Sequence, residues 1–521
     1  MKNILTIFII ILFFFLWASV GWATNYYVNC DLGTGSNDGT SPANAWKTIG
    51  DITGISNGDD VYFYNGSTCS GSEIPNAGFD ISWKGLITNQ SIVGCYTSAG
   101  VFTCATKPII DGDNTKPTTE RGLVDATYTS YASPGGYLTI ENLHVRESAE
   151  YGILIKWGDT GNVIQNNYVF TSNGYAYHGQ GIILAETNSS TITGNEVVGD
   201  TDQNAGGIVV SSNGVIGHAD NNIVSYNSVH MIDECINVAR ATRYTIVEGN
   251  EVYNCNNVGI YMDQAVEAVV RYNLVYADST GGGWSTPLDY GIHIENEAGY
   301  GGCVTDGNIV HGNMIANAIY GIGLTNQLQR VVDGTCTLDN NKIYNNTIID
   351  SSTGNIRIVL GPDQGGGAQS AWSGNVIQNN ISWTKAQGSH VSDGCDDTGF
   401  TWGWNLWDEA PSGTCNSGND PDNAAPGIST GTDFTDLTAG AVTGEEFKPT
   451  GATANGYNEG HSIASYNDRI TASDFTANPP TVTTDTDDAD FWVGAWMYGA
   501  GGISAPDYPL QGAKLSGAKY N

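Results

Sequence analysis

Two acidic residues near the middle of the chain occupy matching places in two similar short segments. Gly259–Asp263 reads GIYMD and Gly291–Glu295 reads GIHIE. The alternation of apolar residues with other residues is typical of β-strands that bury one face. If the two strands are neighbours, Asp263 and Glu295 lie about one strand spacing apart, roughly 5 Å. Carboxyl groups about 5–5.5 Å apart match the geometry of a retaining glycosidase.

Mutual repulsion would keep one carboxyl group of such a pair protonated and leave the other ionised, which separates acid from nucleophile. His293 and Tyr261, beside the two acids in the same strands, could orient them. Asn237 stands at the equivalent position of a preceding segment, Cys235–Ala239, and Arg240 follows that segment. We expect Asn237 to contact substrate and Arg240 to reach toward Asp263. Two alternatives remain for the acids: a solvated face without chemistry, and calcium or sugar binding without turnover.

Trp284 lies in an insertion between the two acidic segments, at residues 279–289. The insertion is long enough to form one wall of a groove. We expect Trp284 to stack on a sugar ring, although an indole in a loop can equally pack against its own chain.

A second cluster comprises His230, Asp233 and Glu234 before one strand, with Arg240 and Arg243 after it. A polysaccharide lyase needs a base, often Lys or Arg, and a cation to neutralise the uronate. Arg240, Arg243 and Arg271 are therefore candidates for a lyase that uses Ca²⁺, and structural ion pairs are the alternative. The Asp-Pro-His-Asp motif of alginate epimerases is absent, and the isolated residues His178, His218 and His461 are interpreted as structural.

Two phrases recur through the chain and predict a solenoid. One ends in Asn, and its copies at Asn227, Asn250 and Asn273 are 23 residues apart. The other has the form Gly-Ile-x-apolar and alternates with the first. Each coil therefore carries at least two strands, with Ile and its apolar partner inward. Stacked coils would place the Asn residues in a ladder at the bends, where Asn also tolerates a left-handed backbone. A propeller or a leucine-rich solenoid fits less well.

The composition limits the partners. Nineteen Lys and Arg stand against 54 Asp and Glu, giving a net charge of −35. This charge argues against nucleic acid, and less firmly against polyanionic sugars. We expect a monomer whose partner is a polysaccharide or oligosaccharide, with no membrane span after the signal is removed.

The first 23 residues resemble a secretory signal, with Lys2, an apolar core and a small-x-small site ending at Ala23. An N-terminal membrane anchor is the alternative. Ten cysteines follow it, which in an exported chain implies disulfides. Proximity suggests five pairs: Cys30–Cys69, Cys95–Cys104, Cys235–Cys255, Cys303–Cys336 and Cys395–Cys415.

The mature start, YYVNCDLGTGSNDGTSPANAWKTIGDI, has an aromatic-rich strand, a Gly/Asn/Asp loop and a short helix expected at 45–49. This opening resembles the N-terminal cap of secreted right-handed parallel β-helix proteins of the pectate-lyase-like superfamily. FWVGAWMY at 491–498 partly resembles their closing strand. GIYMD is similar to the Gly-Ile-Tyr-Leu-Asp phrase of β-helix glycoside hydrolases, including β-xylosidase-like enzymes. That resemblance implies that Asp263 is the nucleophile and Glu295 the acid/base.

These observations together predict an all-β, secreted, right-handed parallel β-helix with two caps. The expected divisions are a signal at 1–23, an N-terminal cap and first coils at 24–110, the helix at 111–385, C-terminal coils and cap at 386–500, and a tail at 501–521. The favoured function is a glycoside hydrolase that uses Asp263 and Glu295. The alternatives are a calcium-assisted polysaccharide lyase and a non-enzymatic glycan-binding or structural protein.

Overall fold

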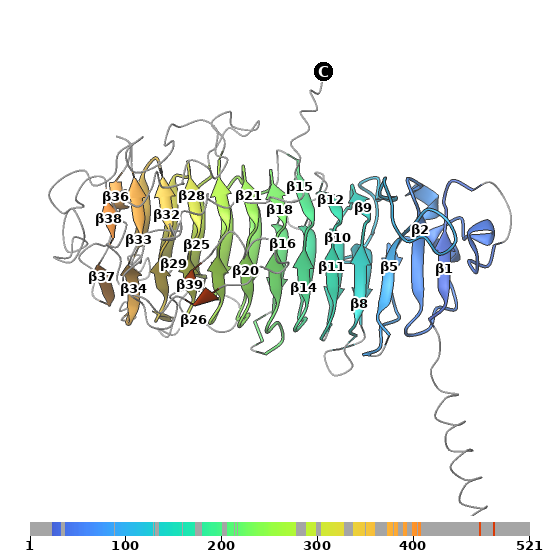
Figure 1. Ribbon diagram of the computed structural model, residues 1–521, viewed down its shortest axis with the longest axis horizontal. Helices are drawn as coiled ribbons and strands as arrows, with labels where there is room; N and C mark the ends of the chain where they lie inside the picture. The colour runs from blue at the N-terminus through green and yellow to red at the C-terminus, as the bar shows by residue number, and fades with distance from the viewer. Residues whose placement is uncertain are drawn as a thin grey trace, which may run out of the picture.

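The computed structural model is a stack of coils, each crossing three long parallel sheets (Figure 1). Successive coils follow one another along the long axis, as the colour gradient shows. The structure describes the following residues: 23–32, 37–87, 89–128, 130, 135–158, 160–171, 180–200, 206–212, 214–215, 217–277, 288–297, 304–327, 337–349, 351–359, 372–378, 380–383, 389–392, 399–403, 405–407, 468–469 and 483–484. The predicted signal lies outside them, apart from Ala23. No helix in the described ranges is long and apolar enough to span a membrane.

Sheet A has 13 described strands and sheet B has 12. Sheet A comprises β1 Asn25–Val28, β2 Asp60–Tyr64, β5 Ser91–Tyr96, β8 Leu138–Glu141, β11 Val163–Gln165, β14 Thr191–Thr193, β17 Ile223–Ser225, β20 Ile246–Glu248, β23 Val269–Arg271, β27 Ile309–His311, β31 Lys342–Tyr344, β34 Asn375–Gln378 and β37 Phe400–Gly403. Sheet B comprises β3 Thr68–Ser70, β6 Ile109–Asp111, β9 His144–Arg146, β12 Tyr168–Thr171, β15 Glu196–Gly199, β18 Ser228–His230, β21 Glu251–Tyr253, β24 Leu274–Tyr276, β28 Met314–Ala316, β32 Thr347–Ile349, β35 Ile381–Trp383 and β38 Leu406–Trp407.

Sheet C contains the Gly-Ile phrases and has 11 described strands. They are β4 Phe79–Asp80, β7 Gly122–Thr127, β10 Tyr151–Lys156, β13 Gln180–Ala185, β16 Gly206–Ser211, β19 Glu234–Ala239, β22 Val258–Asp263, β25 Tyr290–Glu297, β29 Tyr320–Gln327, β33 Gly354–Val359 and β36 Ser389–Ser392. Two small pairs complete the strands: β26 Val304–Asp306 with β30 Thr337–Asp339, and β39 Asp468–Arg469 with β40 Thr483–Thr484.

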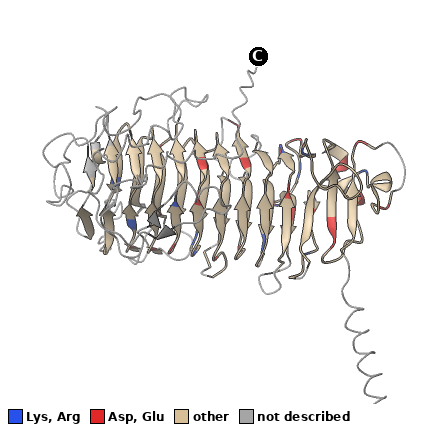
Figure 2. Cartoon of the chain, in the orientation of Figure 1, with Lys and Arg blue, Asp and Glu red and all other residues tan. Residues whose placement is uncertain are grey.

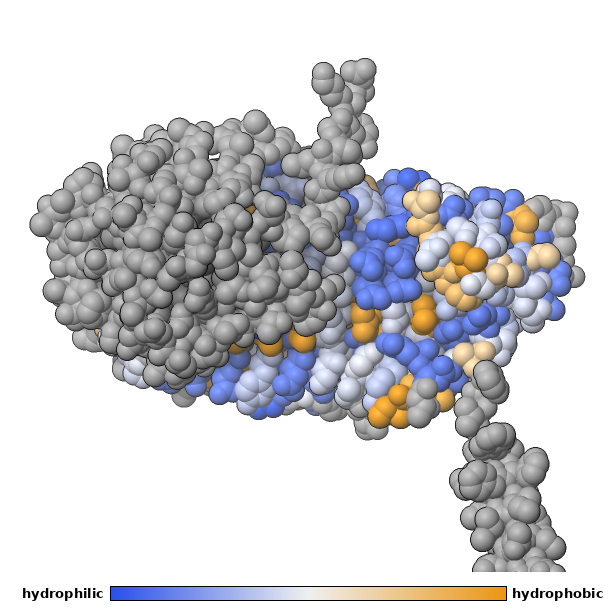
Figure 3. All heavy atoms as spheres, viewed as in Figure 1, coloured by the Kyte–Doolittle hydropathy of each residue, from blue (hydrophilic) through white to orange (hydrophobic). Residues whose placement is uncertain are grey.

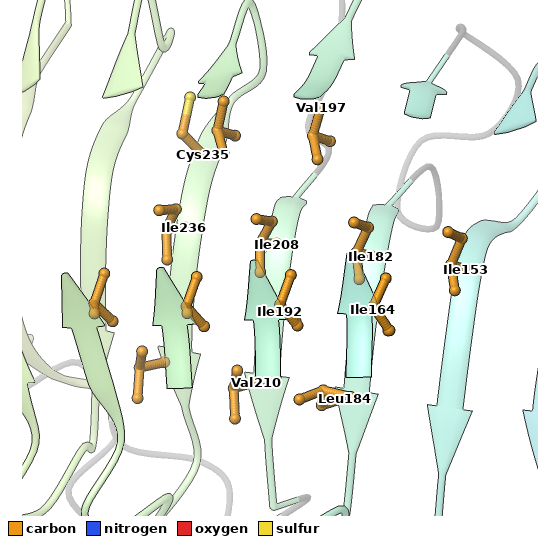
Figure 4. Packing of buried hydrophobic residues seen from close by; sticks show 14 of the residues in the cluster. Ile153, Ile164, Ile182, Leu184, Ile192, Val197, Ile208, Val210, Cys235 and Ile236 are labelled. Atoms are coloured by element: carbon orange, nitrogen blue, oxygen red, sulfur yellow. The ribbon is translucent and has the colours of Figure 1, made fainter. Parts of the chain in front are cut away.

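The interior of the coils is a continuous apolar core. The two inward positions of the Gly-Ile phrase, such as Ile153 and Ile155, have no exposed surface, as predicted. Side chains of the same kind stack from coil to coil, for example Ile182 on Ile208 and Ile236 (Figure 4). Because each coil repeats the pattern, every apolar ladder is buried by its neighbours above and below.

The predicted Asn ladder runs between sheets A and B. Asn250 shows the pattern: its Nδ2 donates to Asn273 Oδ1 (2.9 Å) and to the carbonyl of Val224 (3.0 Å), and its Oδ1 accepts from the backbone N–H and the Nδ2 of Asn227. Hydrogen bonds of this kind join nine residues: Asn167, Asn195, Asn227, Asn250, Asn273, Asn313, Asn346, Asn380 and Asn405.

The left-handed backbone at this bend belongs to the residue before the ladder Asn, which corrects the expectation that Asn itself adopts it. Tyr226, Gly249 and Tyr272, for example, have φ of 54°, 63° and 58°. Tyrosine and glycine alternate here for a steric reason: a Cβ on Gly249 would lie 2.5 Å from the ring of Tyr226.

The N-terminal end caps the stack differently from the expectation. The helix expected at 45–49 does not form. Residues 45–48 are not helical and lie between two 3-10 turns, η1 Pro42–Asn44 and η2 Ile49–Asp51, and a third, η3 Gly71–Glu73, follows β3. Trp46 is buried, stacks on Tyr26 and bridges to Val28, so it closes the first coil as an extended residue. Three of the predicted disulfides are present, Cys30–Cys69, Cys95–Cys104 and Cys235–Cys255. The other two pairs lie outside the described residues.

The visible surface is mainly hydrophilic (Figure 3), as expected for a chain with many acidic residues. In the part of the view not covered by grey atoms, hydrophilic residues predominate and apolar ones form small separate patches (Figure 3). Exposed large apolar side chains, such as Ile87 and Val215, are scattered along the described chain.

Asp60 in the N-terminal cap predicts a dependence of stability on pH. Burial raises the pKa of Asp60 to about 6, although its carboxylate accepts hydrogen bonds from Ile92 N–H and the Tyr62 hydroxyl. The folded state therefore binds more protons than the unfolded state between pH 3.8 and about 6, and stability falls as pH rises through this window. We expect Asp60→Asn to stabilise the fold at pH 8 by about 1–2 kcal/mol, allowing for solvent screening, and to have little effect at pH 3.5.

Thermal unfolding of both proteins at the two pH values measures this difference. The isosteric amide keeps an acceptor for Ile92 N–H, so packing is unchanged. An equal shift in Tm at both pH values would show that the effect is not the charge of Asp60.

Candidate active site

Three neighbouring strands of sheet C bring the predicted residues together. β22 and β25 are adjacent and in parallel register, with Asp263 paired to Glu295 and Tyr261 to His293. β29 follows in the same register and places Thr325 beside Glu295. This register confirms the prediction that the two acids stand side by side on neighbouring coils. All four predicted residues are buried: Tyr261 is 4% exposed, Asp263 5%, His293 5% and Glu295 2%. A solvated face does not describe them.

Glu295 is held by its neighbours on both sides. The Tyr261 hydroxyl donates to Glu295 Oε2 (2.7 Å), and the Thr325 hydroxyl donates to Glu295 Oε1 (3.1 Å). Hydroxyl donors favour a negatively charged carboxylate. Both oxygens are thus fixed by side chains from strands that are themselves fixed by the ladder, so the carboxyl group is oriented before any ligand binds.

His293 completes a chain of hydrogen bonds to the same carboxyl group. Its Nε2 lies 2.7 Å from Thr325 Oγ1, and its Nδ1 lies 3.5 Å from Glu295 Oε2. Thr325 has one proton, which it gives to Glu295, so His293 Nε2 must carry a proton and donate to Thr325. Burial, with the positive charge of Arg357 as a second cause, lowers the pKa of His293 to about 3. The imidazole is therefore neutral, and its Nδ1 is an acceptor facing Glu295.

An aromatic stack extends from this group toward the C-terminal coils. The Tyr290 ring is parallel to His293 with centroids 3.9 Å apart, and Tyr320 follows at 5.1 Å. The Arg357 guanidinium hydrogen-bonds the Tyr290 hydroxyl and lies 4.2 Å from the Tyr320 ring centroid. Burial raises the pKa of Tyr290 to about 12, so its hydroxyl keeps its proton at neutral pH. Arg357 therefore places a positive charge beside the stacked rings of Tyr290 and Tyr320.

Sequence reasoning missed four members of this cluster: Thr325, Arg357, Tyr290 and Tyr320. Thr325 and Arg357 stand in the two outward columns of the Gly-Ile phrase, and register alone places Thr325 next to Glu295. Tyr290 and Tyr320 precede the Gly of that phrase and form a third outward column. Aligning that column would have found them.

The other predicted residues have more limited contacts. Asn237 pairs in register with Tyr261, and its Nδ2 donates to Glu234 Oε2 (2.6 Å) while its Oδ1 is buried without a hydrogen bond. The backbone N–H of Arg240 donates to the carbonyl oxygen of Asp263 (2.8 Å). The predicted reach of the Arg240 guanidinium to Asp263 stays a prediction. Trp284 lies outside the described residues.

Two of the arginines considered for a lyase, Arg243 and Arg271, form ion pairs with acids of the β-helix. Arg243 binds Asp220 through Nε and a terminal nitrogen, and Arg271 binds Glu248. His218, interpreted as structural, lies 3.3 Å from Glu186. His178 and His461 lie outside the described residues. Among the residues that the structure describes, no group of three or more His, Cys, Asp or Glu side chains could hold a metal ion.

Comparison with known proteins supports the architecture. Residues 158–348 match the family model described as "Right handed beta helix region". The chain is a right-handed parallel β-helix. No curated protein matches its sequence. This β-helix is similar to solved structures at low identity. They include pectate lyase Pel9A, with 12% identity, a TM-score of 0.48 and coverage of 92% of this chain and 98% of that one.

Two further solved structures are a GH136 lacto-N-biosidase from Eubacterium ramulus and a rhamnogalacturonan lyase. The first has 16% identity and a TM-score of 0.47, covering 74% of this chain and 67% of that one. The second has 15% identity and a TM-score of 0.43, covering 80% and 91%. A fold does not determine a reaction, so the activity of this β-helix must be argued from its own side chains.

Two buried neutral histidines predict that the β-helix loses stability in acid. Burial lowers the pKa of both His293 and His311 to about 3, whereas an unfolded histidine titrates near 6.5. Between these values the unfolded chain binds protons that the folded chain does not, so stability decreases as pH falls from about 6.5 toward 3. We expect His311→Phe, which keeps the ring stacked on Tyr344, to reduce the loss of Tm between pH 7 and pH 4.5.

Thermal unfolding at the two pH values, with wild type beside the variant, measures the change. His218→Gln is the control, because that histidine is partly exposed. The prediction is wrong if wild type and His311→Phe lose the same Tm on acidification.

Proposed function

We propose that this β-helix processes carbohydrate and that it is a glycoside hydrolase whose catalytic groups are Asp263 and Glu295. The observation that carries the proposal is the direct pairing of these two buried acids on adjacent strands, within a cluster of hydroxyl and imidazole groups. Adjacent strands are about 4.8 Å apart, which suits two carboxyl groups on the same side of a sheet for a double-displacement reaction.

In this mechanism Asp263 attacks the anomeric carbon and Glu295 protonates the departing glycosidic oxygen. The bond to the leaving group breaks as a covalent glycosyl–Asp263 ester forms. Glu295, now ionised, removes a proton from water, and the resulting hydroxide displaces Asp263 with net retention. His293, Thr325 and Tyr261 position Glu295 throughout.

The surroundings of Glu295 fit a group that both gives and takes a proton. Two hydroxyl donors stabilise its ionised form, whereas the unprotonated Nδ1 of His293, 3.5 Å from Oε2, favours the protonated form. On the side away from Glu295, Asp263 pairs in register with Ala239, whereas Glu295 pairs with Thr325 on its far side. The two acids therefore have different neighbours. Such a difference is what separates a nucleophile from an acid.

A polysaccharide lyase is the second candidate, and Arg357 is the observation that favours it. Its guanidinium beside the Tyr290 hydroxyl would neutralise a uronate carboxylate at the edge of the site. Ca²⁺ would be needed if that charge is insufficient. The net charge of −35 disfavours a polyanionic substrate, so hydrolysis of a neutral oligosaccharide or polysaccharide remains the main proposal.

Product analysis distinguishes the candidates. Purified full-length protein is incubated with neutral glycans, including xylan, arabinoxylan and β-glucan oligosaccharides, and separately with polyuronates and Ca²⁺. New reducing ends without ultraviolet absorbance, with retained anomeric configuration by NMR, support hydrolysis by the pair. Unsaturated products that absorb in the ultraviolet support the lyase. No turnover on either set supports a binding or structural protein.

The roles of the two acids can be separated with one further substrate. An aryl glycoside with a good leaving group needs little protonation, so Glu295→Gln should retain far more activity on it than on a natural glycan. Asp263→Asn should be inactive on both, because the nucleophile is absent in either case. If Glu295→Gln lost the same fraction of its activity on the aryl glycoside and on the natural glycan, Glu295 would not be the general acid.

A further inference from the structure

A second cluster of polar and aromatic side chains lies on the outer side of sheet B, away from the sheet C site. Two acids occupy one column of this sheet: Glu196 on β15 pairs in register with Ser228 on β18, which pairs with Glu251 on β21. The Cα atoms of Glu196 and Glu251 are therefore two strand spacings apart, about 9.6 Å. Figure 2 shows acidic positions in red on the strands of sheet B and no charge on the strand between them.

A row of stacked rings forms the next column of the same face. His230 pairs with Tyr253, which pairs with Tyr276. The His230 and Tyr253 rings are parallel with centroids 4.4 Å apart, and Tyr253 and Tyr276 follow at 5.3 Å. The Tyr276 hydroxyl donates to Glu251 Oε1 (3.1 Å), which joins the two columns.

His230 is the feature that points to a ligand. It is only 9% exposed, and both of its ring nitrogens are buried without a hydrogen bond. Its Nε2 lies 3.7 Å from Glu196 Oε1, which is longer than a hydrogen bond. A buried polar group without a hydrogen bond costs about 1–3 kcal/mol. A molecule that moves the Glu196 carboxylate within hydrogen-bond distance of His230 Nε2 would recover part of that energy.

The two acids differ in their surroundings. Glu196 is about half exposed, and the neighbouring His230 lowers its pKa. Burial raises the pKa of Glu251, which the Tyr276 hydroxyl partly offsets. One edge of the cluster therefore presents the half-exposed Glu196 carboxylate to solvent, and the other a more buried carboxyl group that accepts from Tyr276. Ser228, small and hydroxylated, leaves space between them.

We propose that this face, formed by Glu196, Ser228, His230, Glu251, Tyr253 and Tyr276, is a binding site for a neutral saccharide that lies along the axis of the β-helix. Sugar hydroxyls donate to the Glu196 and Glu251 carboxylates and to the Tyr276 oxygen, and accept from the Ser228 hydroxyl. Ring edges of the stack supply the apolar contact. The two carboxylates outnumber Lys107, the cation beside Glu196, so the site favours a ligand without negative charge over a uronate or a sulfated glycan. No substrate bond is broken here, and the site is independent of the chemistry proposed on sheet C.

The full-length Asp263→Asn/Glu295→Gln protein is the background for the test, because it blocks turnover without altering sheet B. Isothermal titration with cellohexaose, xylohexaose and N-acetylchitohexaose, and with a galacturonate hexamer, measures binding. We expect at least one neutral hexasaccharide to bind and the uronate not to bind. Glu196→Gln and Tyr276→Phe should each weaken that binding about tenfold, the loss of one hydrogen bond to a charged group.

Glu267→Gln is the matched control: it removes an equal charge from an exposed acid next to sheet A and should leave affinity unchanged. Glu196 is about half exposed, so its amide variant is expected to fold, and circular dichroism checks this for every variant. Absence of binding for all three neutral probes overturns the proposal. So does binding that Glu196→Gln and Tyr276→Phe leave unchanged, because the saccharide then lies on another face. Failure of turnover in wild type affects only the sheet C proposal.

Discussion

Replacing Asp263 by Asn is expected to abolish glycan turnover, with kcat lower by at least about 10³-fold, because the amide cannot form the glycosyl ester. Replacing Glu295 by Gln is expected to lower kcat on natural glycans by about 10²–10⁴-fold, the usual contribution of a positioned general acid. Both changes keep the shape of the side chain. The register of β22 and β25 depends on backbone hydrogen bonds and apolar ladders that neither change touches.

Initial rates on the best neutral substrate, measured with wild type and both variants, check this prediction. Glu267→Gln is the control, since it removes an exposed acid next to sheet A rather than on sheet C. Unfolding temperatures must match wild type to within a few degrees. If both Asp263→Asn and Glu295→Gln turned over substrate at the wild-type rate, these two acids would not be the catalytic groups.

Replacing Asn250 by Ala is expected to have the largest effect on stability. The change removes the acceptor for the backbone N–H and Nδ2 of Asn227 and the donor to Val224 and Asn273. These groups are buried and water cannot easily replace the lost side chain. Each unsatisfied group costs about 1–3 kcal/mol, so we expect a loss of about 3–5 kcal/mol after local relaxation.

Thermal unfolding measures this loss, and hydrogen exchange locates it. We expect faster exchange in the coils on either side of Asn250, because a solenoid transmits changes mainly to its nearest neighbours. Asn44→Ala, at an exposed position of a 3-10 turn in the N-terminal cap, is the control. Equal Tm values for Asn250→Ala and Asn44→Ala would show that the ladder contributes little.

The periodic parts of the molecule could be predicted from residue order alone. A buried strand needs alternating apolar residues, and a stacked coil needs the same residue at the same bend, so both leave a repeat in the sequence. The inward Ile positions, the Asn ladder and the pairing of Asp263 with Glu295 followed from this repeat. Three disulfides also followed, because cysteines that close short loops in successive coils are near each other in space.

The non-periodic contacts could not be read in the same way. The helix expected around Trp46 failed because the indole closes the first coil in an extended conformation, where burial outweighs local preference. The left-handed residue at the Asn bend precedes Asn, and Gly249 occupies this position beside Tyr226 because a Cβ there would meet the tyrosine ring. Thr325, Tyr290 and Arg357 were overlooked because their roles depend on which side chains meet across strands that are about 30 residues apart.

The sequence alone determined the solenoid, the face on which the acids stand and their adjacency, because each of these depends on a local pattern repeated at a fixed period. Only the tertiary structure decided that Asp263 and Glu295 are buried, that His293 is neutral, and that Glu295 is held by Tyr261 and Thr325. The physical reason is that burial and hydrogen bonding are properties of several coils together. Burial and hydrogen bonding set the charge state of an acid, and neither can be read from the residue types of a single strand.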